Sequence, residues 1–310
     1  MVSFRFSSLF VMVTASLTLA HSFHDVDSLF PRQSESAVGP ELQVLAEGNK
    51  IFRQSTDPEL LKKLTFEGQT PSFMYFGCVD SRVNDGTIFN AKPGTLFTER
   101  NIANQFHSSD TNAEATLAFS VAVLGVRHVV VMGHYGCGGI GAAIASRPLG
   151  NIDAAGGAIQ SWIEPIRELF ESSTRPEIVE LRESIKGRTD VPFPDVREPG
   201  YRALVEENIK QNVVRVARSN IIVNHYALLA EKKENKSDVF IHGWVYDVEN
   251  GEVRDLGVSV GPPGKPIPAL PWEKVAGAGK QFAHTHDSTK EHCQDKCKST
   301  VAHTLIKTKY

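Results

Sequence analysis

Two cysteines and one histidine stand at a spacing that suits a metal ion. Cys78 follows a short apolar run, and Cys137 stands three residues after His134 in the glycine-rich segment Gly133 to Gly139. Two thiolates and one imidazole are a donor set suited to zinc. Three protein ligands leave the fourth position of a tetrahedral ion open, which is the pattern of a catalytic site with one ion per chain. Taken singly, either cysteine would be a small buried hydrophobe.

A carboxylate and a guanidinium follow Cys78 at two-residue intervals, as Asp80 and Arg82. Asp80 is close enough to be a fourth ligand or to accept a hydrogen bond from a zinc-bound hydroxide. Arg82 would keep Asp80 ionised and oriented. Zinc lowers the pKa of its bound water towards ~7, so such a site produces a nucleophile near neutral pH. Without Cys78 beside them, Asp80 and Arg82 would be an ordinary surface ion pair.

The pair of motifs Cys78-x-Asp80-x-Arg82 and His134-x-x-Cys137 resembles the zinc signature of the β-class carbonic anhydrases. The resemblance extends over roughly residues 42–260. It implies reversible hydration of carbon dioxide to bicarbonate and a proton, by attack of zinc-bound hydroxide. It also implies a homodimer or tetramer with the pocket between two subunits.

The resemblance assigns substrate binding to four further positions, Gln69, Phe97, Ile102 and Gly138. Gln69 matches an amide that hydrogen-bonds the substrate, often across a subunit interface. Phe97 and Ile102 match positions that line a small apolar pocket. One position departs from the family, because Phe119 stands where many members carry tyrosine. By residue type alone, Gln69 would satisfy a loop and the apolar residues would belong to the core.

The fourth zinc position has two possible states. Asp80 either pairs with Arg82 and leaves room for water, or swings onto the metal and blocks the nucleophile. Gln69, two residues before Pro71, resembles the family branch that holds the open state. We therefore expect a zinc-bound water near neutral pH, with Asp80 held by Arg82.

The elements that position these residues are typical of an α/β fold. Short apolar runs predict strands at residues 73–76, 96–98 and 129–132. Cys78 and His134 follow two of these strands. A helical pattern separates the last two strands, which predicts a mostly parallel central sheet flanked by helices. Sites in such sheets form beyond the carboxyl ends of the strands, so Cys78 and His134 are expected to meet there.

Apolar spacing predicts helices at residues 42–52, 111–124, 159–170 and 201–217, the first of them an extended N-terminal helix. Asp110 or Thr111 is expected to cap the second helix and Gly125 to end it. The apolar run Val239 to Val245, the turn at 249–251 and a strand at 253–256 predict a hairpin at the C-terminal edge of the sheet. An edge there would need cover, which favours association with a second copy.

The chain ends are expected to lie outside the catalytic domain. The sequence divides into a signal peptide at 1–20, a flexible segment or propeptide at 21–40, the catalytic domain at 41–261 and a largely irregular tail at 262–310. The first segment has one cation, Arg5, before an apolar run, which is typical of secretion. A transit peptide to an organelle is the alternative. The single Arg32 is a weak processing signal.

Three residues near the C-terminal end are candidates for modification. Asn235, in Asn-Lys-Ser, is a candidate for N-glycosylation. Cys293 and Cys297 are best explained by a local disulfide or by a link between subunits. Several histidines lie nearby, so a second metal site and free thiols are the alternatives.

Composition and motif together exclude several classes of protein. The 310 residues are 41% hydrophobic and 22% charged, which excludes a disordered or disulfide-dense chain. Thirty-three basic against 36 acidic residues argue against a nucleic-acid partner, and no further window resembles a membrane helix.

Two functions besides carbon dioxide hydration remain open at this point. The same zinc site would serve hydrolysis of carbonyl sulfide or carbon disulfide. A zinc-stabilised binding or redox module is the non-enzymatic alternative. The Asp80 and Arg82 pair argues against such a module, because a structural zinc site needs four closed ligands.

Overall fold

The computed structural model describes residues 39–148, 150, 152–231 and 236–275. The predicted signal peptide, nearly all of the 21–40 segment, Asn235, Cys293 and Cys297 lie outside these residues. The chain divides into two compact units, Met1–Lys62 and Lys63–Tyr310. None of the helices in the described residues is long and apolar enough to cross a bilayer.

The helices are α2 (Pro40–Ser55), α3 (Pro58–Phe66), α4 (Asp85–Ile88), α5 (Thr111–Ala118), α6 (Gly138–Ile144), α7 (Ala154–Ser172), α8 (Pro176–Ser184), α9 (Pro199–Ala217) and α10 (Asn220–Glu231), with a 3-10 turn η2 (Ile102–Asn104) and a π-helical turn η3 (Phe119–Val123). The strands are β1 (Phe73–Cys78), β2 (Leu96–Asn101), β3 (His128–His134), β4 (Phe240–Tyr246) and β5 (Val253–Asp255).

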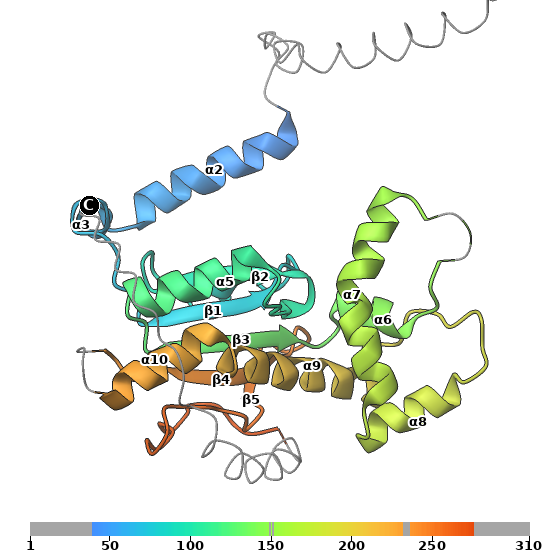
Figure 1. Cartoon of the computed structure of the whole chain (residues 1–310). Coiled ribbons are helices and arrows are strands. Elements are labelled where there is room, and N and C mark those ends of the chain that lie inside the picture. Colours follow the sequence, from blue (N-terminus) through green and yellow to red (C-terminus); the bar gives the residue numbers. More distant parts are fainter. Residues whose placement is uncertain (1–38, 149, 151, 232–235, 276–310) are drawn as a thin grey trace, which may run out of the picture. The chain divides into compact units, whose positions relative to one another are not determined.

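The five strands form one sheet in the order β2-β1-β3-β4-β5 (Figure 1). The first four are parallel, and β5 runs antiparallel to β4. The predicted α/β fold with a C-terminal edge hairpin is confirmed. In the parallel register Gly77 lies opposite Met132. Cys78, at the end of β1, and His134, at the end of β3, therefore emerge at the same edge of the sheet.

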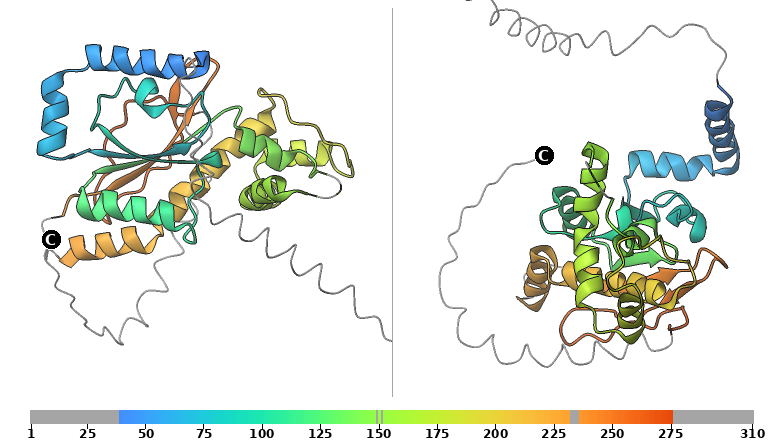
Figure 2. Two further views of the ribbon diagram at one scale, coloured as in Figure 1. Left: turned by 90° about the horizontal axis from the view of Figure 1, so that it is seen from above. Right: turned by 90° about the vertical axis from the view of Figure 1, so that its right-hand side faces the viewer.

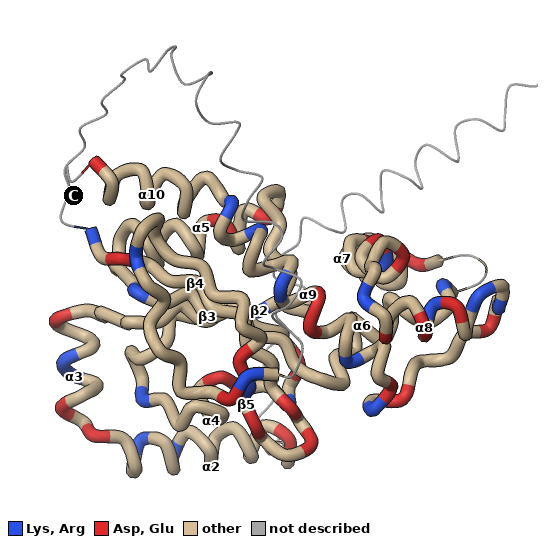
Figure 3. The backbone as a smooth tube through the Cα atoms, turned by 90° about the horizontal axis from the view of Figure 1, so that it is seen from below, with Lys and Arg blue, Asp and Glu red and all other residues tan. Residues whose placement is uncertain are grey.

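The two faces of the sheet are covered differently. Met74 and Phe76 point to a core that includes residues of α5, α9 and α10. Tyr75, Met132 and Trp244 point to the opposite face, where the region of α4 packs. Figures 2 and 3 show α5 and α10 on one side of the sheet and α4 on the other. Burial on both faces explains why the strands read as continuous apolar runs.

The hairpin lies at the edge of the sheet as predicted, but its first strand is not the exposed one. Val239 is fully buried, and β4 lies between β3 and β5, so this run needs no cover from another chain. Within the described residues, the outer side of β5 is bridged by Lys274, whereas β2, at the opposite edge, has no strand beyond it. Association through a free edge of the sheet would therefore involve β2.

Some helices were not predicted, and another ends in a π-helical turn that the sequence did not indicate. Asp110 caps α5 as expected, but α5 ends at Ala118 and continues as the π-helical turn η3 before Gly125, whose φ is +66°. Helices α3, α4, α6, α8 and α10 have no counterpart in the prediction. Helix α8 buries only Ile178 and Leu181, which is too sparse a pattern to detect.

Gly243 in β4 lets α9 pack close to the sheet. A Cβ at this position would lie 2.5 Å from Val258 and 3.0 Å from Val213 of α9. We expect Gly243→Ala to lower the free energy of unfolding by about 1–3 kcal/mol, because neither neighbour can move freely. Gly157→Ala in α7, where a Cβ meets nothing within 4 Å, is the control and should stabilise by about 0.4–1 kcal/mol. Urea unfolding measures both, and equal values would contradict the packing argument.

Candidate metal centre

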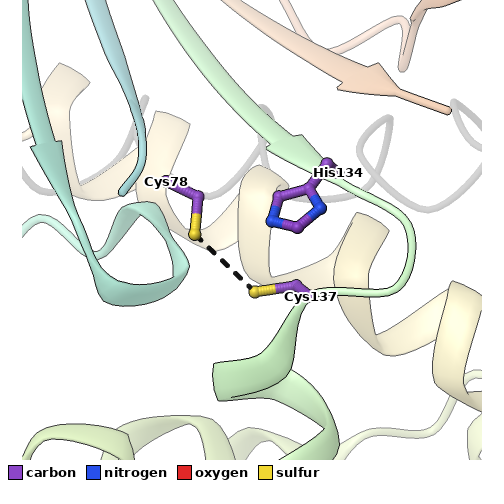
Figure 4. Close-up of side chains that lie close together, drawn as sticks. All are labelled: Cys78, His134 and Cys137. Atoms are coloured by element: carbon purple, nitrogen blue, oxygen red, sulfur yellow. Dashed lines mark hydrogen bonds between the residues drawn. The ribbon is translucent and has the colours of Figure 1, made fainter. Parts of the chain in front are cut away.

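Cys78, His134 and Cys137 converge beyond the carboxyl ends of β1 and β3 (Figure 4). Their ligand atoms lie within 4.8 Å of one another, and all three residues are buried. The two Sγ atoms are 3.9 Å apart. Two thiolates on one tetrahedral zinc, each at ~2.3 Å, would be about 3.8 Å apart, so the pair needs almost no movement to bind the ion.

The histidine already presents the correct nitrogen. His134 Nδ1 lies 3.0 Å from the backbone oxygen of Tyr135, which can only accept, so Nδ1 carries the proton. The other nitrogen, Nε2, is buried without a hydrogen-bond partner in the described structure. Leaving a buried nitrogen without a partner costs free energy. A metal ion bound between this nitrogen and the two sulfurs would supply the missing partner.

One of the two thiols is prepared for a metal. A hydrogen bond from the Cys137 thiol lowers the pKa of Cys78, while the same bond and burial raise the pKa of Cys137. Cys78 is therefore the first of the pair to become a thiolate, which is the form that binds a metal. The donor set, its burial and the unpaired His134 nitrogen together fit zinc.

Asp80 is held by Arg82 at the edge of this cluster. The Arg82 backbone N–H and Nε donate to Asp80 Oδ1 at 3.0 and 2.9 Å, and Nη2 donates to Oδ2 at 2.7 Å. These bonds lower the pKa of Asp80 to about 2, so it is ionised at neutral pH. Asp80 Oδ2 lies 3.8 Å from His134 Nε2. Arg82 also donates to the backbone oxygen of Gly136, which ties Asp80 to the loop that carries Cys137.

Arg100 holds the loop that carries Cys78 and Asp80. Its Nε donates to the backbone oxygen of Cys78, and Nη2 donates to those of Asp80 and Val83, each at 2.8 Å. One side chain therefore binds three carbonyls of the loop that follows β1. No signal in the sequence indicates this role of Arg100, because its three partners lie 17–22 residues away and leave no local pattern.

Tyr201 of α9 anchors Cys137. Its hydroxyl donates to the backbone oxygen of Cys137 at 2.6 Å, and the side chain is fully buried. We expect Tyr201→Phe to cost about 1–3 kcal/mol of unfolding free energy, because the carbonyl is left unpaired. Zinc affinity should fall about tenfold, as for other partners of metal-bound residues.

The matched control is Tyr226→Phe, which removes a similar bond to the backbone oxygen of Val239. This variant should lose stability by a comparable amount and keep its zinc affinity. Competition with a zinc-binding dye measures affinity and urea unfolding measures stability. Equal zinc affinity in the two variants would show that Tyr201 does not position the ligand.

The structure does not bring all the proposed substrate residues to this cluster. Ile102 lies close, because a Cβ on Gly139 would be 2.7 Å from its Cγ2, and Gly138 is the first residue of α6, directly after Cys137. Gln69 is exposed in the loop before β1. Phe97 lies opposite Met74, four residues before the end of β1, and stacks on Phe119 at 5.8 Å between ring centroids.

The loop around the site contains strained backbone that the sequence did not reveal. Ala103 and Asn104 have φ of 60° and 45°, in the left-handed region that alanine rarely adopts. Asn208 donates to the backbone oxygen of Ala103 at 2.9 Å and holds this conformation. It brings residues 102–103 against the glycines that follow Cys137.

Basic and acidic residues are mixed along the described part of the chain. Figure 3 shows Lys and Arg interspersed with Asp and Glu along the described chain. This distribution agrees with the near-neutral balance of 33 basic and 36 acidic residues. It gives no support to a nucleic-acid partner.

Comparisons with known proteins give a consistent result. The family model described as carbonic anhydrase matches residues 73–253. A carbonic anhydrase of Emericella nidulans is 28% identical over 208 residues, which cover 66% of this chain and 78% of the relative. The β-carbonic anhydrase CafA of Aspergillus fumigatus has 30% identity and a TM-score of 0.54, covering 70% of this chain and 90% of its own.

A structure from Sordaria macrospora, described among two tetrameric β-carbonic anhydrases, has 25% identity and a TM-score of 0.52. It covers 70% of this chain and 95% of its own. The residues matched by the family model include Cys78, His134 and Cys137.

Proposed function

Because this chain belongs to the carbonic anhydrase family, in its β class, we propose that it catalyses the zinc-dependent, reversible hydration of carbon dioxide. The observation that carries this proposal is the buried cluster of Cys78, His134 and Cys137 with an ionised Asp80 at its edge. Carbon dioxide and water give bicarbonate and one proton, which leaves to solvent or buffer.

Each residue of the site has a distinct task. Cys78, His134 and Cys137 would hold zinc, which when bound makes water nucleophilic near neutral pH. Asp80 Oδ2 accepts the hydrogen bond of the attacking O–H group, and as an ionised carboxylate it can only accept. Arg82 keeps this oxygen deprotonated and holds it by a hydrogen bond of 2.7 Å from Nη2. The pairing of Asp80 with Arg82 supports the open state of the fourth zinc position.

The substrate needs little more than an apolar surface beside this oxygen. Ile102 is 37% exposed and lies against the loop that follows Cys137, so it offers such a surface. Carbon dioxide has no charge and no hydrogen to donate, and an apolar wall admits it without loss of hydrogen bonds. Bicarbonate is charged and better solvated in water, which favours its release.

Parallel assays of two substrates test this proposal against its alternative. Zinc-loaded protein should hydrate carbon dioxide with kcat/KM in the range of about 10⁴–10⁸ M⁻¹s⁻¹, followed by stopped flow with a pH indicator. Sulfide release from carbon disulfide should stay at the level of the buffer blank. Rapid sulfide release with no hydration of carbon dioxide would favour the hydrolase instead.

We further propose that the active form is a homodimer or tetramer in which β2 lies near the interface. Phe119, which stacks on Phe97 of this edge strand, is 46% exposed, and Val123 at the end of the same turn is 65% exposed. Exposed apolar residues beside an unpaired strand are typical of an interface. A partner copy would also explain how the exposed Gln69 reaches a substrate.

Sedimentation should show a dimer or tetramer for the unchanged chain. Phe119→Asp should shift the protein towards monomer and lower its activity, because a buried charge destabilises an apolar interface. Ile159→Asp is the control, since Ile159 has the same 46% exposure but lies on α7. A fully active monomer would refute both the interface and the role of Gln69.

A further inference from the structure

A cavity lies at the opposite end of the sheet from the metal ligands. Its volume is about 590 Å³, and Phe73 and His128, the first residues of β1 and β3, line it. His134 is six residues further along β3, about 20 Å away at 3.3 Å per residue. The volume falls in the range of small-molecule sites, and the proposed reaction makes no use of this cavity.

Aromatic rings form one wall of the cavity. The register places Phe73 opposite His128 in neighbouring strands, and their ring centroids are 5.4 Å apart. His128 stacks on His242 at 5.3 Å, and His242 stacks on Trp244 at 5.8 Å. The ring of Trp272 packs edge-on against that of Trp244, with 5.6 Å between the ring centroids. Such a wall suits a flat aromatic ligand, because offset and edge contacts are favourable.

A chain of hydrogen bonds joins the half-buried Ser259 to two histidines of this wall. Ser259 Oγ lies 2.8 Å from His242 Nδ1, and His242 Nε2 lies 3.0 Å from His128 Nδ1. Burial lowers the pKa of His242 to about 4, so this histidine is neutral. If the Ser259 hydroxyl donates to His242 Nδ1, His242 Nε2–H donates to His128 Nδ1. The proton of His128 is then on Nε2, which becomes a free donor at the end of the chain. No group in the described part of the chain accepts a hydrogen bond from His128 Nε2.

The charged side chain that lines the cavity, within the described residues, is a cation. Lys92 lines it and makes no ion pair in the described part of the chain. Neither aspartate nor glutamate is among the described residues that line it. A ligand with one negative charge would therefore meet a cation and a donor without a competing carboxylate.

We propose that this cavity binds a small aromatic monocarboxylate. The ring system lies against the wall formed by His128, His242 and Trp244. The carboxylate accepts from His128 Nε2–H and lies near the Lys92 ammonium. Binding selects the direction of the hydrogen-bond chain in which Ser259 donates, because a carboxylate accepts only.

NMR titration of the full-length, zinc-loaded protein with 2-naphthoate tests this proposal. The three tryptophans of the chain are Trp162, Trp244 and Trp272, and only the last two line the cavity. Their indole N–H signals should shift in a saturable way while that of Trp162 stays in place. The ring nitrogen signals of His128 should report a proton on Nε2. Shifts confined to the metal ligands, or at no tryptophan, would overturn the proposal.

Two variants and a neutral analogue complete the test. His128→Phe keeps the aromatic stack and should weaken 2-naphthoate about tenfold, the loss expected for one hydrogen bond to a charged group. Lys92→Met keeps the side-chain stem and should weaken it about threefold, as for an exposed charge pair. Lys62→Met, outside the cavity, is the control and should bind normally. Equal affinity for 2-naphthamide, unchanged by Lys92→Met, would show apolar binding only and overturn the carboxylate assignment.

Discussion

Replacing Cys137 with alanine is expected to remove zinc and carbon dioxide hydration together. Two remaining ligands bind zinc far more weakly than three, and the nucleophile depends on the ion. Activity should fall at least about 10³-fold, close to the rate in buffer, and zinc should drop well below one ion per chain. Stopped-flow assays and metal analysis of the same sample measure the two quantities.

Two further variants test whether the loss of zinc in Cys137→Ala comes from the missing ligand and not from disturbed packing. Cys137→Ser keeps the volume of the side chain and should lose zinc in the same way. Met132→Leu changes a fully buried side chain of β3 that packs with Tyr75 and Trp244 and is not a ligand, and it should keep zinc and activity. Stoichiometric zinc with full turnover in Cys137→Ala would show that the ligand set is wrong.

Arg82→Ala is expected to lower activity while the zinc content stays unchanged. Zinc should stay near one ion per chain, because none of its ligands is changed. Asp80 loses the two hydrogen bonds from the guanidinium and keeps only the one from the backbone N–H of residue 82, so its carboxylate becomes free to turn towards the metal. Activity should fall by about 10–100-fold, the usual cost of removing a group that orients a metal site.

The control for Arg82→Ala is Arg197→Ala. Arg197 pairs with Glu249 on the surface and does not contact Asp80, so its loss should leave activity unchanged. Arg82→Lys, which keeps the charge but not the two parallel bonds, should have intermediate activity. Loss of zinc in Arg82→Ala would show that Arg82 supports the ligands and not Asp80.

The positions of Cys78 and His134 followed from the sequence because parallel strands impose them. Strands buried on both faces give continuous apolar runs, and their carboxyl ends share one edge. The residue types at Cys78, His134 and Cys137 then indicated zinc. None of these steps needed contacts between distant side chains.

The supports of the site could not be predicted in the same way. Arg100, Tyr201 and Asn208 act through backbone carbonyls far away in the sequence. A single arginine or tyrosine has many possible partners, and spacing does not select among them. The left-handed Ala103 contradicts the local preference of alanine and is imposed by tertiary contacts.

Hydration of carbon dioxide during zinc reconstitution tests the central claim most directly. Protein stripped with a chelator is titrated with zinc, and each sample is assayed by stopped flow. We expect the rate to rise in proportion to bound zinc, to level off at one ion per chain, and to vanish again with chelator. A zinc-saturated protein no faster than buffer, or full activity in the stripped protein, would contradict the account.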